Sequence, residues 1–208
     1  MKQVIFLNLI AHRGLIKNGA KENSIEAFQN AIESENYKGF EFDIRTSKDG
    51  IFFIHHNIFL DGRLFNTIES KELKEIYKLP TLEEVLNLKT DKIMLLEIKE
   101  PNINIDNLIT LLSSFKSKNI YIDSFDNQII QKLIKADNDF KYGVLNYILN
   151  SEKDYSEYQF IGLLSPIITE KLLTFFKDQK LEVFVYGIKK NSKLEDIPNV
   201  YYIVDAKE

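Results

Sequence analysis

Short apolar runs alternate along this chain with amphipathic segments, and brief polar stretches separate them. Runs of this length, bounded by polar residues, are typical of buried strands, whereas apolar residues spaced three and four apart indicate helices. We predict strands over residues 4–11, 39–44, 51–55, 93–99, 120–123, 142–145, 160–164, 183–187 and 201–204. We predict helices over residues 23–35, 82–88, 106–116, 127–136 and 169–179. Asn23 with Glu26, and Thr81 with Glu84, have the spacing of helix-capping pairs.

The alternation of strands and helices predicts an α/β fold with a mostly parallel sheet. Nine strands are one more than an eight-stranded barrel needs, and residues 45–50 are too few for a parallel crossover. Asp49-Gly50 is a turn signal, so residues 51–55 should fold back as a hairpin that places Asp43 opposite His55. We therefore expect a TIM (β/α)8 barrel with a short hairpin-like excursion, in one domain over residues 1–208.

Composition narrows the possible functions. The net charge of −4 offers no general attraction to nucleic acid or anionic lipid. The chain has no cysteine, which excludes disulfides and thiolate metal sites. Residues 4–11 faintly resemble a signal peptide but are interpreted as the first buried strand. No apolar run approaches the ~18 residues that span a membrane, so we expect no stable membrane anchor and a cytoplasmic location.

Charged and imidazole side chains gather at the ends of the predicted strands. His12 follows the first strand, and His55 and His56 end the third. Side chains two residues apart on a strand share a face, which puts Glu41 beside Asp43 and Glu97 beside Lys99. Each group alone has an ordinary structural explanation, such as a surface ion pair. Together, at strand ends that converge on one face of a barrel, they indicate an active site.

Six strings carry a family resemblance: AHRG (11–14), ENSIEAF (22–28), GFEFDIRTSKDGIFFIHH (39–56), LPTLEEVL (79–86), LLEIKEP (95–101) and IDSFD (122–126). In this order and spacing, the chain resembles the glycerophosphodiester phosphodiesterases of the TIM-barrel phosphodiesterase superfamily. The resemblance implies metal-dependent hydrolysis of a small-molecule glycerophosphodiester to glycerol 3-phosphate and an alcohol. In that family, the first step often forms a cyclic 1,2-phosphate, which water then opens.

The resemblance also implies roles for individual residues. Carboxylates at Glu41, Asp43 and Glu97 would hold one divalent ion, Mg²⁺ or Ca²⁺, which prefers oxygen ligands. The imidazoles of His12 and His55 would exchange protons with the substrate. The remaining assignments are Arg13 and Lys99 at the phosphate, Glu22 and Asn23 supporting the loop behind His12, His56 as a rim residue, and Tyr186 at a position that is usually Trp.

Departures from the family pattern leave other functions open. His56 stands where Asp is usual, and residues 57–78 are short for the family's cap, so we expect a reduced cap. One alternative is a cyclising phosphodiester lyase of the sphingomyelinase-D type, although Glu97 with Lys99 favours the hydrolase. Another is a phosphodiesterase that tailors a glycerol-phosphate-bearing surface polysaccharide. A non-catalytic barrel would be expected to have lost one of the histidines or carboxylates, and none is missing.

Overall fold

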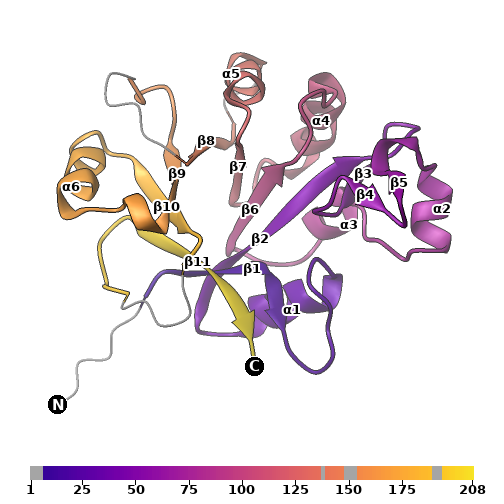
Figure 1. Cartoon of the computed structure of the whole chain (residues 1–208), viewed down its shortest axis with the longest axis horizontal. Helices are drawn as coiled ribbons and strands as arrows, with labels where there is room; N and C mark the ends of the chain where they lie inside the picture. The colour runs from indigo at the N-terminus through magenta and orange to yellow at the C-terminus, as the bar shows by residue number, and fades with distance from the viewer. Residues whose placement is uncertain (1–6, 137–138, 148–153, 189–193) are drawn as a thin grey trace.

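A computed structural model describes residues 7–136, 139–147, 154–188 and 194–208 of the chain. Across these residues, eight parallel strands form a closed barrel, drawn as a ring in Figure 1. In order around the ring, they are β1 (Leu9–Ile16), β2 (Tyr37–Thr46), β6 (Ile93–Ile98), β7 (Ile120–Ser124), β8 (Lys141–Asn146), β9 (Phe160–Leu164), β10 (Glu182–Tyr186) and β11 (Val200–Lys207). The first strand closes the ring by pairing with both β2 and β11. The predicted TIM barrel is confirmed.

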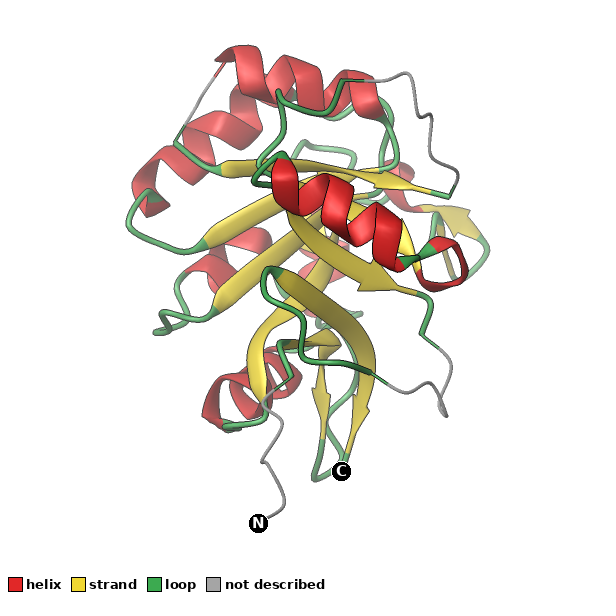
Figure 2. Cartoon of the chain, turned by 90° about the vertical axis from the view of Figure 1, so that its left-hand side faces the viewer, coloured by secondary structure: helices red, strands yellow, loops and turns green. Residues whose placement is uncertain are grey.

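Helices between strands cover the outside of the barrel (Figure 2). They are α1 (Ile25–Glu33), α3 (Leu82–Leu86), α4 (Ile105–Leu112), α5 (Asn127–Ala136) and α6 (Glu170–Asp178), with short 3-10 turns at Ser113–Phe115 and Ser165–Ile167. No helix in the described part of the chain has both the length and the apolar character needed to cross a bilayer.

Side chains alternate between the two faces of each strand, so the barrel has one apolar layer outside, against the helices, and another inside. Phe40, Phe42 and Ile44 of β2 belong to the large cluster shared with the helices, where Phe28 of α1 stacks on Phe40 at 4.9 Å. A second, smaller cluster joins residues of six barrel strands: Ile10, Ile93, Leu95, Tyr121, Phe160, Phe184 and Ile203. On β2, Glu41 and Asp43 alternate with the members of the outer layer, so they point to the barrel interior.

The predicted hairpin excursion is present as β3 (Phe52–Ile54), which pairs antiparallel with β2. Its tight turn is closed by hydrogen bonds between Ser47 and Ile51 and between Gly50 and Ser47. A small cap follows, built from β4 (Phe59–Leu60), β5 (Arg63–Leu64), a 3-10 turn (Phe65–Thr67) and α2 (Ser70–Glu75). Phe53, Phe65, Ile68 and Leu73 give this cap an apolar core of its own.

Two local predictions need correction. The first strand spans Leu9–Ile16 rather than residues 4–11, of which residues 4–6 lie outside the described part of the chain. The cap of α1 is Ser24, whose hydroxyl accepts from the amide of Ala27, and not Asn23. Asn23 is instead held in left-handed backbone geometry, and its amide group bonds to Asp43. The capping box of Thr81 and Glu84 at α3 is confirmed.

Candidate active site

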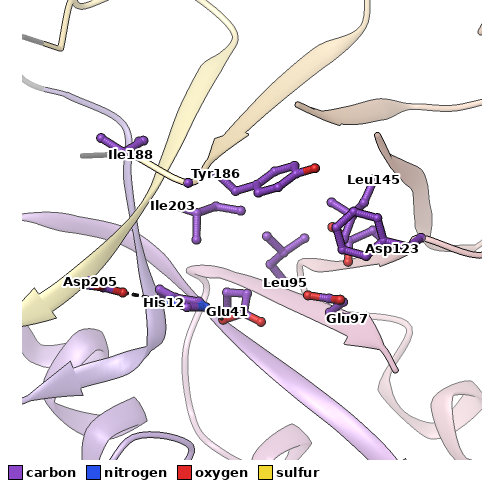
Figure 3. A pocket seen from close by; sticks show the side chains of 12 residues that line it. His12, Glu41, Leu95, Glu97, Asp123, Leu145, Tyr186, Ile188, Ile203 and Asp205 are labelled. Atoms are coloured by element: carbon purple, nitrogen blue, oxygen red, sulfur yellow. Dashed lines mark hydrogen bonds and ion pairs between the residues drawn. The ribbon is translucent and has the colours of Figure 1, made fainter. Parts of the chain in front are cut away.

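The strand ends surround a cavity of about 370 Å³. Figure 3 shows His12, Glu41, Glu97 and Asp123 on its walls, with Tyr186 across from Leu95. Active sites of barrels of this kind lie at the carboxyl ends of the strands, where side chains from different strands meet. The complete lining is His12, Glu41, Leu95, Glu97, Asp123, Phe125, Leu145, Tyr186, Gly187, Ile188, Ile203 and Asp205.

Three carboxylates form the polar centre of the site. Glu41 and Asp43 lie on β2, and Asp43 is in register with Glu97 on β6. One oxygen from each carboxylate lies within 4.8 Å of the others. Glu41 and Asp43 are 3% and 1% exposed, so water cannot separate their charges. The predicted carboxylates therefore come together as a compact group of oxygen donors, which we call the acidic triad.

The carboxylates of the acidic triad are buried close enough together to repel one another. Burial, and then the neighbouring Asp43 and Glu97, raise the pKa of Glu41 well above its usual range. Burial likewise raises the pKa of Glu97. Among the described residues, no donor reaches Glu41 Oε1 or Asp43 Oδ1 with a hydrogen bond. Buried carboxylate oxygens that accept no hydrogen bond, in this arrangement, match the ligand set of a hard divalent cation.

Two basic side chains flank the acidic triad. Lys99 Nζ lies 2.6 Å from Glu97 Oε1 and 3.6 Å from Asp43 Oδ1. Arg13 Nε lies 3.3 Å from Asp43 Oδ2, and its backbone N–H donates to Glu41 Oε2 at 2.9 Å. Burial opposes the charged form of Lys99, but Glu97 and Asp43 outweigh it and raise the pKa of this ammonium group. Lys99 therefore keeps its positive charge beside the acidic triad.

A backbone irregularity after His12 positions Arg13. Arg13 and Gly14 have φ of +55° and +84°, so the chain departs from regular strand geometry there. A Cβ on Gly14 would lie 2.8 Å from the backbone of Ala27 in α1, so only glycine permits this close packing. Glu22 Oε1 accepts from the Arg13 guanidinium at 3.1 Å, and the Asn23 side-chain amide donates to Asp43 Oδ2 at 3.0 Å. Glu22 and Asn23 thus buttress the loop and one triad carboxylate.

His12 is held by a carboxylate that the sequence analysis did not assign. Its Nδ1 lies 2.8 Å from Asp205 Oδ1, and its Nε2 lies 3.8 Å from Glu41 Oε2. Because a carboxylate accepts at Nδ1, the Nδ1–H tautomer is favoured and Nε2 keeps its lone pair. This hydrogen bond also lowers the pKa of Asp205.

The two adjacent histidines have different surroundings. The ring of His55 stacks on Phe65 of the cap at 4.9 Å, and its buried Nε2 has no hydrogen-bond partner among the described residues. Burial lowers the pKa of both histidines, and the charge of Asp43 acts on both, whereas Arg13 and Lys99 act on His56. The buried Arg45 guanidinium donates two hydrogen bonds, of 2.9 and 2.8 Å, to the backbone carbonyl of His56. His56 therefore sits among the charges of the site, whereas His55 packs into the cap.

Tyr186 lies on the cavity wall, as its predicted supporting role requires, and its hydroxyl donates to the carbonyl of Asn146 at 2.8 Å. Sequence reasoning missed Asp123, Asp205 and Arg45. Asp123 and Asp205 each stand at the end of an apolar run, the same signal that marked Glu97. Arg45 lies two residues after Asp43 on the same strand face.

The profile of the glycerophosphoryl diester phosphodiesterase family matches residues 12–206. No curated protein matches the chain. Among solved structures, a glycerophosphodiester phosphodiesterase from Parabacteroides distasonis is 19% identical with a TM-score of 0.79, and the match covers 97% of this chain and 93% of that one. The Thermotoga maritima glycerophosphodiester phosphodiesterase is 24% identical with a TM-score of 0.71, covering 96% and 94%.

A third similar structure is an Oleispira antarctica phosphodiesterase in complex with the product sn-glycerol-3-phosphate. It is 18% identical with a TM-score of 0.74, and the match covers 89% of this chain and 86% of that one. At these identities, the three structures establish a shared fold.

Proposed function

Because the chain belongs to the glycerophosphoryl diester phosphodiesterase family, we propose that it hydrolyses glycerophosphodiesters to glycerol 3-phosphate and an alcohol, using a divalent metal ion and two histidines. The observation that carries this proposal is the acidic triad, flanked by Arg13 and Lys99, in a cavity at the carboxyl ends of the barrel strands. The product named for the Oleispira antarctica structure is the product expected here.

The acidic triad would hold Mg²⁺ or Ca²⁺. Support comes from the three oxygens within 4.8 Å of one another and from Glu41 Oε1 and Asp43 Oδ1, which accept no hydrogen bond from a described residue. A divalent cation bound there supplies a Lewis acid that draws charge from a phosphate oxygen. Arg13 and Lys99 would hold the other anionic oxygen and stabilise the charge that builds up on it.

His12 is the proposed base. With Nδ1 bonded to Asp205, its Nε2 is left to take a proton on the side of Glu41 and the cavity. The attacking oxygen, a substrate hydroxyl or water, bonds to phosphorus and loses its proton to His12. The bond from phosphorus to the departing alcohol breaks, and a second imidazole protonates that alcohol. If the attacking group is a glycerol hydroxyl, the product is a cyclic phosphate, which one water then opens.

For the second imidazole, the contacts favour His56 over His55, the residue that we predicted from the sequence. The charges of Arg13 and Lys99 act on His56, and Arg45 fixes its backbone, whereas the charge of Asp43 acts on both histidines. His55 has Phe65 against its ring and a hydrogen bond to the backbone of Phe59. We therefore propose His12 and His56 as the proton-transfer pair, with His55 as a packing residue of the cap.

Phosphorus NMR of the purified protein with a panel of glycerophosphodiesters tests the activity. The panel contains choline, ethanolamine, glycerol and inositol esters, each with Mg²⁺ or Ca²⁺. Formation of the glycerol 3-phosphate signal supports the proposal. A cyclic phosphate as the final product would instead identify a cyclising lyase, and unchanged spectra for the whole panel would contradict catalysis of this reaction.

A further inference from the structure

Asp123 is a buried carboxylate that the proposed mechanism does not use. It lies on β7, in register with Glu97 on the neighbouring strand, and is 1% exposed. It lines the cavity, where Figure 3 shows it on the wall beyond Glu97. Its Oδ1 is buried and receives no hydrogen bond from any described residue. Leaving such an oxygen without a donor is costly, so this oxygen is suited to receive one from a ligand.

Asp123 stands outside the acidic triad. In the described part of the chain, the oxygens that come within 4.8 Å of one another belong to Glu41, Asp43 and Glu97, and Asp123 is not among them. Adjacent strands are about 4.8 Å apart, so Asp123 stands one strand farther around the wall than Glu97. A group bound at Asp123 would lie beside the ion, not on it.

The Lys99 charge acts on Asp123, but no described side chain donates a hydrogen bond to its Oδ1. The cavity lining, as far as the chain is described, contains no lysine or arginine. The Tyr186 hydroxyl is already committed to the carbonyl of Asn146. Leu95, Leu145 and Ile203 make much of the remaining wall apolar. A small neutral group that carries one hydroxyl and an apolar face matches this corner of the cavity.

We propose that Asp123 accepts a hydrogen bond from the substrate's glycerol group and selects for it. The donor is the terminal hydroxyl, one carbon farther from phosphorus than the glycerol hydroxyl that attacks phosphorus to form the cyclic phosphate. This inference rests on the proposed function, because it specifies how the same site recognises the glycerol end of its diester. Asp123 is then a specificity residue, whereas the proton transfers belong to the histidines.

Two substrates that differ in one hydroxyl test this. The first is the methyl phosphodiester of glycerol, esterified at a terminal carbon, and the second is the methyl phosphodiester of propane-1,2-diol, esterified at carbon 1. The second keeps the neighbouring hydroxyl and lacks the terminal one. Because this buried oxygen lacks a donor unless the terminal hydroxyl supplies one, the wild type should prefer the first substrate in kcat/KM by about 5- to 150-fold. Asp123→Ala should bring this ratio close to one, mainly by slowing the first substrate.

The ratio of the two kcat/KM values distinguishes lost recognition of the terminal hydroxyl from a distorted site, because distortion lowers kcat/KM for both substrates together. Asp178→Ala, at an exposed position at the end of α6, is the matched control and should keep the wild-type ratio. Asp123→Asn, which preserves the size of the side chain, provides a second test if the alanine variant folds poorly, and it should also lower the ratio. An unchanged ratio in a folded Asp123 variant would overturn the inference. Wild-type hydrolysis of the glycerol substrate would still support the proposed function in that case.

Discussion

The backbone N–H of His55 donates a 3.0 Å hydrogen bond to the carbonyl of Asp43 across the β2–β3 hairpin. The pairing of Ile44 with Ile54 continues to these two residues, so a triad carboxylate and the paired histidines are joined by local chain geometry. Beyond Ile54, the strand ends, and the rule that side chains alternate between faces no longer applies. The ring of His55 stacks on Phe65, and Arg45 donates hydrogen bonds to the backbone carbonyl of His56.

This geometry predicts unequal effects for the histidine variants. His12→Ala and His56→Ala should each lower kcat by ~10²–10⁴-fold, the usual contribution of a positioned proton donor or acceptor. His55→Ala is the adjacent control. It should mainly lower the free energy of unfolding through lost packing on Phe65, with kcat reduced far less. Steady-state kinetics and denaturant titration measure the two effects. A nearly normal His56 variant beside an inactive, folded His55 variant would restore the assignment predicted from the sequence.

The acidic triad predicts weaker ion binding when its charge is reduced. Glu41→Gln should raise the dissociation constant for Mg²⁺ and Ca²⁺ by at least about 10-fold, because one charged ligand is lost. Without the ion, the variant should be as stable as the wild type or more stable, since Asp43 and Glu97 now repel one fewer charge. Calorimetric titration gives the affinity, and Glu35→Gln, at an exposed position, is the control. Equal affinities in wild type and Glu41→Gln would remove Glu41 from the ion site.

We expect replacement of Gly14 by alanine to lower the free energy of unfolding more than the same replacement at another glycine with positive φ. Gly14→Ala adds a Cβ at 2.8 Å from Ala27 in a residue with φ of +84°. Gly19 has nearly the same φ, +82°, with nothing within 4 Å of its added Cβ. We expect Gly19→Ala to lose about 1 kcal/mol from backbone strain and Gly14→Ala to lose more, because α1 must also shift. Equal losses in urea unfolding would show that the packing of α1 does not constrain Gly14.

Asp49 joins the hairpin turn to α2, and we expect the stabilisation that it provides to depend on pH. Its carboxylate accepts from the Ser47 hydroxyl and from the amide and hydroxyl of Ser70, and the hydrogen bonds from Ser70 and Ser47 lower its pKa to about 2. A carboxylate whose pKa is depressed on folding stabilises the fold above its unfolded pKa, and that contribution is lost as the pH falls toward the folded pKa. Asp49→Asn should therefore be less stable than wild type at pH 6, and the difference should shrink between about pH 4 and pH 2. A difference that stays constant over that range would contradict this role.

The barrel and the acidic triad followed from features near one another in the sequence. Asp49-Gly50 and the short connection predicted the hairpin, and Glu41 with Asp43 shared a strand face. The contact between His12 and Asp205 could not be predicted in this way. These residues are 193 positions apart and meet because β1 pairs with β11 in register, which requires the closed barrel. The position of Asp123 beside Glu97 likewise depends on the pairing of β6 with β7, which spacing in the sequence does not reveal.

The choice of His56 as the proposed second histidine depends on side-chain packing that residue spacing does not encode. His55 and His56 are adjacent and chemically identical, so alternation alone assigned His55 to the side of Asp43. The cap supplies Phe65 for one ring, and Arg45 holds the backbone of the other. Neither contact can be predicted from the sequence at positions 55 and 56 alone.

The most direct test of the account is glycerol 3-phosphate formation by protein that has been stripped of divalent ions. Phosphorus NMR with glycerophosphocholine should show no hydrolysis in the presence of a chelator and restored hydrolysis when excess Mg²⁺ or Ca²⁺ is added. The Glu41→Gln protein should need more ion to reach its smaller rate. Full hydrolysis in the stripped, chelated protein, unaffected by Glu41→Gln, would contradict catalysis at the acidic triad.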